Sequence, residues 1–303
     1  MKLKFIFIFS AILSALSFTS NAFALRVVTT FTVLEDITRN IAGKYATVES
    51  LTPIGAEIHE YEPTSRDLVR LNRSDLIITN GLGLEKWFQR FYQRAKNIPV
   101  VEASKGVVPS LITEGPYAGQ PNPHGWMSLT NASIYVENIK NALIEHDPAN
   151  KEGYEANAKA YLEKLAKMEA DVRTFISKNN LEGAYLITSE SAFSYLARDI
   201  NLRYDSIWPV NAEDVGTPAQ ITRIINLVRD NKIKVVFSGS TMDLKPMEVV
   251  MQETGAQFGG YLYVDTLTDA KGPVPTYLDM LSKTVYTIVD GYNKTLHASH
   301  SKH

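Results

Sequence analysis

The stretch NKEGYEANAKAYLEKLAKMEADVRTFISKN, residues 150–179, decides how the rest of the chain is interpreted. It contains no proline and, after Gly153, no glycine, and it is rich in Ala, Leu, Glu and Lys, which favour helices. Apolar side chains such as Leu165 and Val172 recur at helical spacing. We therefore predict one rigid helix, on the order of 45 Å long. A coiled coil is the alternative, although the heptad signal lasts only about four turns.

Strand-like and helix-like segments alternate on both sides of this helix. Before it, predicted strands cover residues 26–31, 46–54, 75–79 and 99–101, and predicted helices cover 33–42, 65–71, 84–94 and a segment from about 131. After it, predicted strands cover 184–188, 234–238 and 261–264, and predicted helices cover 194–199, 218–230, 246–254 and 275–292. Such alternation is typical of an α/β fold. We predict two similar lobes, residues 25–149 and 180–303, each a mostly parallel sheet flanked by helices, joined by the helix of residues 150–179.

The N-terminus has the features of an export signal. Two lysines precede an apolar run from Phe5 to Phe18, and the small-residue pattern Ala22-Phe23-Ala24 follows. This order is typical of a cleavable secretory signal peptide, and the apolar run is too short to span a bilayer. We predict a signal peptide at residues 1–24 and export to the periplasm of a Gram-negative cell.

The composition narrows the possible chemistry. The chain has no cysteine, so disulfides and thiolate metal ligands are excluded, and any metal site must use nitrogen and oxygen. A lipid-attachment cysteine is likewise absent, which favours a protein without a membrane anchor over a surface adhesin. The chain carries 31 basic and 33 acidic residues, and loss of two signal-peptide lysines leaves a net charge of about −4. No basic cluster stands out, so nucleic acid is not expected as a partner.

Four residues carry the chemical argument: His59, His124, Glu190 and Asp265. His59 follows the second predicted strand, Glu190 follows the strand of residues 184–188, and Asp265 ends the strand of residues 261–264. His124 lies in a turn-rich loop. Ligands of open α/β sheets bind at the carboxyl ends of strands, and two of the four residues come from each predicted lobe. We therefore expect them to meet in a cleft between the lobes.

Two neutral imidazoles and two carboxylates form a ligand set of charge −2, which matches a divalent cation. Mixed nitrogen and oxygen ligands suit Mn, Fe or Zn, whereas Ca or Mg prefers oxygen alone. Taken singly, each residue has a simpler interpretation: a loop histidine is usually solvated, and Asp265 resembles an ordinary surface charge. The main rival for Glu190 is a helix cap ahead of residues 194–199.

Several ordered motifs together indicate a family. They are HEYEPT at 59–64, NGLGLEKWF at 80–88, NPHGWMS at 122–128, TSESAFSY at 188–195, the segment 211–218, YVD at 263–265 and GPVPTY at 272–277. Over its mature length the chain resembles the solute-binding proteins of ABC importers that handle manganese, iron and zinc. The resemblance implies that His59, His124, Glu190 and Asp265 are metal ligands and that the helix from Asn150 is the interlobe backbone. It also implies a monomer that serves an inner-membrane permease and its cytoplasmic ATPase.

The residue at position 190 bears on metal selectivity. The resemblance implies that members of the zinc branch have histidine at the position of Glu190, which gives a three-histidine site. Zinc-specific members also commonly have a long loop rich in histidine and acidic residues before the second histidine. Here residues 102–123 contain no histidine, so manganese or iron is favoured. Zinc still competes, because most nitrogen and oxygen sites bind Zn more strongly than Mn or Fe. Gly239 and Asn122 depart from the glutamate and aspartate of many relatives, and groups around the ligands tune affinity.

We therefore expect a periplasmic protein that captures Mn²⁺ or Fe²⁺, with Zn²⁺ as a further candidate, and delivers the ion to an importer without catalysis. A zinc-specific binding protein is the alternative, and a metal-dependent hydrolase is a further rival. The sequence shows no HExxH, GxSxG or P-loop motif to support an enzyme.

The C-terminal tail holds half of the chain's six histidines, at His297, His300 and His303. A disordered, solvated terminus is the simple interpretation, and weak accessory metal capture or docking is the alternative.

Overall fold

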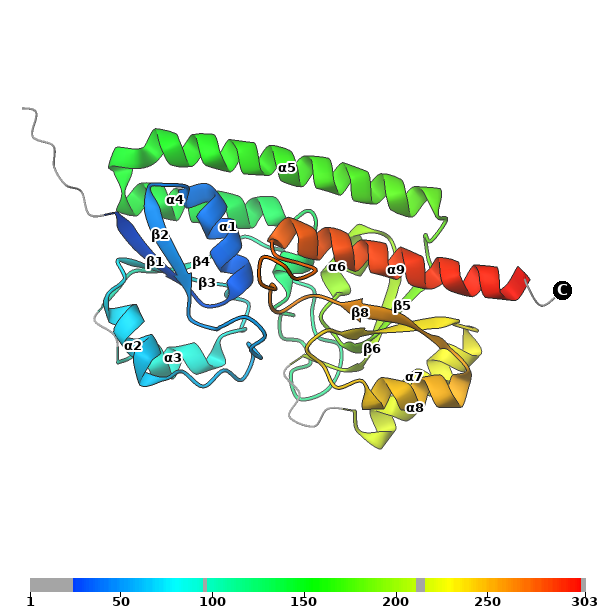
Figure 1. Ribbon diagram of the computed structural model, residues 1–303. Coiled ribbons are helices and arrows are strands. Elements are labelled where there is room, and N and C mark those ends of the chain that lie inside the picture. The colour runs from blue at the N-terminus through cyan, green and yellow to red at the C-terminus, as the bar shows by residue number, and fades with distance from the viewer. Residues whose placement is uncertain (1–23, 95–96, 211–215, 301–303) are drawn as a thin grey trace, which may run out of the picture.

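A computed structural model describes residues 24–94, 97–210 and 216–300, and of residues 296–300 the backbone alone (Figure 1). The predicted signal peptide up to residue 23, the tail residue His303 and most of the motif at 211–218 lie outside the described residues.

The N-terminal lobe contains a four-stranded parallel sheet in the order β2-β1-β3-β4. Its strands are β1 Leu25–Thr29, β2 Ala46–Ser50, β3 Leu76–Thr79 and β4 Val100–Glu102, and its helices are α1 Thr32–Ala42, α2 Ser65–Asn72, α3 Lys86–Tyr92 and α4 Ala132–His146. Val27 and Ile78 face the core shared with α1 and α4, whereas Val28 and Ile77 face α2 and α3. The central strands are therefore apolar on both faces, as parallel sheets require.

The C-terminal lobe has a similar arrangement, built from two pairs of strands. It contains β5 Tyr185–Glu190 paired with β6 Arg203–Trp208, β7 Val235–Gly239 paired with β8 Gln257–Leu262, and helices α6 Ser194–Asp199, α7 Pro218–Asp230, α8 Lys245–Thr254 and α9 Tyr277–His300. Both pairs are parallel. Strands β5 and β7 lie side by side, and the hydroxyls of Ser189 and Ser238 lie 3.1 Å apart between them. The two pairs form separate two-stranded sheets, and their spatial order β6-β5-β7-β8 matches the strand order of the first sheet.

The long helix α5 spans both lobes (Figure 1). It runs over Lys151–Lys178 and packs on α1 and α4 of one lobe and on α9 of the other. Its buried face includes Tyr161 and Val172. The α/β fold with two similar lobes and one connecting helix is confirmed. None of the helices in the described part of the chain has the length and apolar character of a membrane span.

Two strands and the tail differ from prediction. Strand β6 was missed because its sequence, RYDSIW, is polar at the half-exposed edge of the sheet. Strand β8 contains Gly259 and Gly260, which hid its strand pattern, and it ends at Leu262. Asp265 therefore lies in the loop beyond the strand, and the prediction that it ends the strand is wrong. The backbone of α9 continues through His300, so the tail that was expected to be disordered is helical up to that residue.

Candidate metal centre

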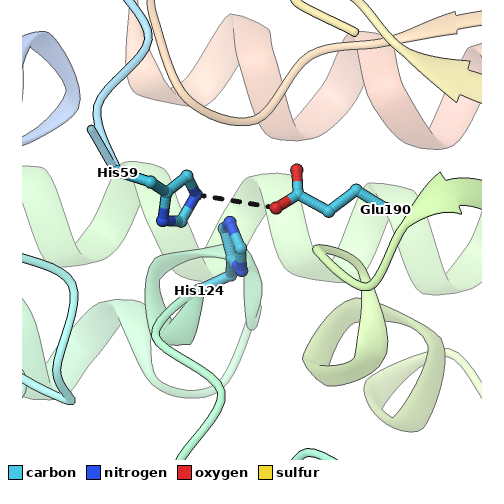
Figure 2. Close-up of side chains that lie close together, drawn as sticks. All are labelled: His59, His124 and Glu190. Atoms are coloured by element: carbon cyan, nitrogen blue, oxygen red, sulfur yellow. Dashed lines mark ion pairs between the residues drawn. The ribbon is translucent and has the colours of Figure 1, made fainter. Parts of the chain in front are cut away.

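The four candidate residues come from four separate segments at the junction of the lobes. His59 lies in the loop between β2 and α2, His124 immediately precedes the short 3-10 helix η1 (Gly125–Met127), and Glu190 is the last residue of β5. Asp265 lies in the loop between β8 and α9. Figure 2 shows His59 and Glu190 facing each other, with the ring of His124 beside them. The structure thus brings together residues that are far apart in sequence.

The distances between these side chains suit one bound ion. His59 Nε2 lies 3.8 Å from Glu190 Oε1 and 4.0 Å from Asp265 Oδ1. One ligand atom from each of His59, His124 and Glu190 falls within 4.8 Å of the others. Ligand atoms about 2.1 Å from a common metal are separated by roughly 3 to 4 Å. The site is shielded from water, since His124 is 0% and Asp265 is 1% exposed.

Asn122 orients the ring of His124. The Asn122 side-chain oxygen accepts a hydrogen bond from the His124 backbone N–H at 3.0 Å and lies 2.9 Å from His124 Nδ1. The Asn122 amide nitrogen donates to Ser191 O at 2.5 Å, which fixes its oxygen toward the ring. An amide oxygen can only accept, so Nδ1 carries a proton, and Nε2 is the ring nitrogen that faces the site. Asn122 therefore orients the His124 ring, a role that aspartate at this position is expected to have in many relatives.

Asp265 is held in a similar way. Thr241 Oγ1 donates to Asp265 Oδ2 at 3.1 Å, which leaves Oδ1 directed toward the histidines, 3.5 Å from His124 Nε2. Neither of these two atoms has a hydrogen-bond partner within the described ranges. Burial alone raises the pKa of the Asp265 carboxyl, but the close approach and charge of His124, with help from His59 and Thr241, hold this pKa below its ordinary value. Asp265 is therefore disposed to be a carboxylate.

The donor set could hold a metal cation. Two imidazoles and two carboxylates converge in a buried space, where mutual repulsion of lone pairs is costly and a divalent ion would offset it. The rival role of Glu190 as a helix cap does not hold, because α6 has Phe193 at its N-cap position and no side-chain cap hydrogen bond.

Sequence reasoning missed two supporting residues. Thr241, which binds Asp265, gave no signal because the two are separated by 24 residues. Glu57 accepts hydrogen bonds from the backbone N–H groups of His59 and Glu60, and its position two residues before His59 was the signal that could have identified it. At Gly239, the other departure, an added Cβ would meet the Met242 side chain at 2.9 Å.

Comparison with known proteins agrees with this geometry. Residues 27–291 match the family described as zinc-uptake complex component A, periplasmic. The chain is 49% identical over 291 residues to the iron-binding protein YfeA of Yersinia pestis, with 94% of each chain covered. It is 33% identical over 282 residues to the manganese ABC transporter substrate-binding lipoprotein PsaA of Streptococcus pneumoniae, with 91% of each covered.

Solved structures give the same result. The Mn-bound periplasmic metal binding protein from Candidatus Liberibacter asiaticus is similar with a TM-score of 0.82 at 39% identity, covering 88% of this chain and 98% of that one. The periplasmic zinc binding protein TroA from Treponema pallidum has a TM-score of 0.81 at 25% identity, with the same coverage. By its sequence, its two-lobed fold and the extent of these matches, the chain belongs to the family of periplasmic metal-binding proteins described as zinc-uptake complex component A.

Proposed function

We propose that this protein captures one divalent transition metal ion in the periplasm and delivers it to an ABC importer. His59, His124, Glu190 and Asp265 are the proposed ligands. The observation that carries the proposal is the convergence of their buried donor atoms at distances of 3.5 to 4.0 Å. Mn²⁺ or Fe²⁺ is the proposed cargo, because two carboxylates make the site harder than a three-histidine site. The names of the iron-binding and manganese-binding relatives support this choice.

The proposed partners are an inner-membrane permease and its cytoplasmic ATPase, which the similarity to the manganese ABC transporter substrate-binding lipoprotein PsaA supports. We further propose that the protein works as a monomer without a membrane anchor, after cleavage of a signal peptide at residues 1–24. No chemical step is needed, because four protein ligands can enclose the ion. A hydrolytic metal site would instead keep a coordination position open for water.

The direct test is elemental analysis of protein purified from periplasm without added metal, with the tail histidines replaced by alanine. We expect about one equivalent of Mn, Fe or Zn, and a sharp loss of metal in Glu190→Ala. Glu182→Ala, which removes an exposed acid just before β5, is the matched control and should retain the metal. A full equivalent in Glu190→Ala, or no transition metal in the parent protein, would contradict the proposal.

Metal affinity should fall as the solution becomes acidic. Both imidazoles must be neutral to bind, and imidazoles ordinarily titrate near pH 6.5, so protons compete with the ion below about that pH. Below it, two competing protons should weaken binding by up to about 100-fold per pH unit. The lowered pKa of Asp265 keeps its carboxylate ionised through this range, so its protonation does not cause the loss. Competition titrations between pH 5 and 8 measure the effect, and a flat profile would argue against histidine ligands.

A further inference from the structure

His124 is fixed by both lobes, although it belongs to the N-terminal half of the chain. From the C-terminal lobe, Tyr195 donates its hydroxyl to Asn122 O at 2.7 Å. Trp126 Nε1, two residues after His124, donates to Val264 O at 2.9 Å. From the N-terminal lobe, Asn80 Nδ2 donates to Pro123 O at 2.9 Å. Glu190 is part of β5, and Asp265 directly follows Val264. His124, Glu190 and Asp265 are therefore all attached to the C-terminal lobe, and we call these three ligands the frame.

His59 is attached differently. Its loop, residues 51–64, leaves the edge strand β2, and within the N-terminal lobe Trp87 Nε1 donates to Ile58 O at 2.9 Å. The outer part of the loop is exposed to solvent: the side chain of Ile54 is 55% exposed, and Gly55 is also exposed. The position of His59 relative to the other three ligands thus depends on how this loop is held against the C-terminal lobe.

Thr266 provides such a contact across the lobes. Its Oγ1 accepts a hydrogen bond from Gly55 N at 2.9 Å and donates to Leu267 O at 3.0 Å. The neighbouring Thr32 Oγ1 accepts from Leu267 N at 3.0 Å, so a hydroxyl pair lies at the junction of the lobes. Thr266 is 7% exposed and directly follows Asp265 in the chain. Gly55 has a φ of +80°, a conformation that glycine adopts without strain.

We propose that Thr266 is a positioning residue for metal retention and that its hydroxyl is the latch that holds the His59 loop against the Asp265 segment. The latch connects the loop of one ligand to the residue beside another, and His59 Nε2 and Asp265 Oδ1 then lie 4.0 Å apart. When the Gly55–Thr266 hydrogen bond opens, His59 withdraws first, and the three ligands of the frame stay together. The inference rests on the proposed metal-binding function.

The test compares dissociation of Mn²⁺ from the full-length protein and its variants after rapid mixing with excess chelator. Thr266→Val keeps the shape of the side chain but cannot accept the Gly55 hydrogen bond, and we expect dissociation to be roughly 5- to 10-fold faster. The metal stoichiometry should remain unchanged, and the association rate should remain nearly unchanged. General destabilisation of the protein would not change the dissociation rate alone. Thr266→Ser restores the hydroxyl and should return the dissociation rate to that of the parent. Thr174→Val, on the exposed face of α5, is the matched control.

The outcomes separate this proposal from the function on which it rests. If the parent protein binds none of Mn²⁺, Fe²⁺ and Zn²⁺, both fail; if it binds Fe²⁺ or Zn²⁺ in place of Mn²⁺, the same release assay is run with that ion. If the parent binds Mn²⁺ and Thr266→Val releases it at the parent rate, the latch alone is wrong. Equal acceleration in Thr174→Val, or no rescue in Thr266→Ser, would also overturn the latch. Should Thr266→Val not fold, Thr266→Ser and Thr266→Ala decide the question, because the latch requires serine to match the parent and alanine to release metal faster.

Discussion

Replacing His124 with alanine should lower the affinity for Mn²⁺ by more than about 100-fold, beyond the range typical of groups that only support a ligand. His124 is completely buried, and Asn122 holds its ring so that Nε2 faces Asp265 Oδ1 at 3.5 Å. The substitution removes a nitrogen ligand and also removes the neighbour that helps keep the pKa of Asp265 low. That pKa should rise, so the remaining carboxylate also becomes a weaker ligand at mildly acidic pH. Competition with a chelator of known affinity measures the change.

His146→Ala is the matched control for this loss. His146 ends α4 and is partly exposed, so its removal should leave Mn²⁺ affinity within about twofold of the parent. Circular dichroism should show both variants folded. Parent-like affinity in His124→Ala, or an equal loss in His146→Ala, would show that the four-ligand assignment is wrong.

The helices were predictable because their signals are local. Helix α2 begins at Ser65 after a capping box between Thr64 and Asp67, and α7 begins at Pro218 after one between Thr217 and Gln220. Both starts agree with the predicted helices. The strands β6 and β8 were harder, because an edge position and two adjacent glycines remove the apolar pattern that identifies a strand.

The four candidate ligands, and their meeting between the lobes, could be proposed from the sequence, but the residues that support them could not. Each candidate ligand occurs in a recognisable local motif, so the four could be named from sequence. Their supports cannot be read this way, because the partners of Asn122 and Trp126 lie 69 and 138 residues away along the chain. The sequence also could not decide whether Glu190 caps α6, because this depends on which residue occupies the N-cap position, and the structure places Phe193 there. Long-range packing between two lobes decides these points, and local patterns carry no information about it.

Of the substitutions considered, Trp126→Ala should lower the free energy of unfolding the most, by about 3 to 5 kcal/mol. The indole is completely buried, with its centroid 4.8 Å from the ring of Phe31 and 4.9 Å from that of His124. Its backbone oxygen also accepts the hydroxyl of Tyr277. Alanine leaves a cavity between the lobes and lets His124 move, so metal affinity should fall as well.

The loss should be measured by urea unfolding of metal-free protein, so that bound ion does not add to the free energy of unfolding. Trp126→Phe separates packing from hydrogen bonding, because it keeps an aromatic ring but cannot donate to Val264 O. We expect it to cost about 1 to 3 kcal/mol, clearly less than alanine, because the carbonyl of Val264 then loses its partner. Equal losses in the two variants would mean that the stabilisation comes from the hydrogen bond to Val264 O and not from packing of the ring. A loss below about 1 kcal/mol in Trp126→Ala would mean that the indole does not hold the lobes together.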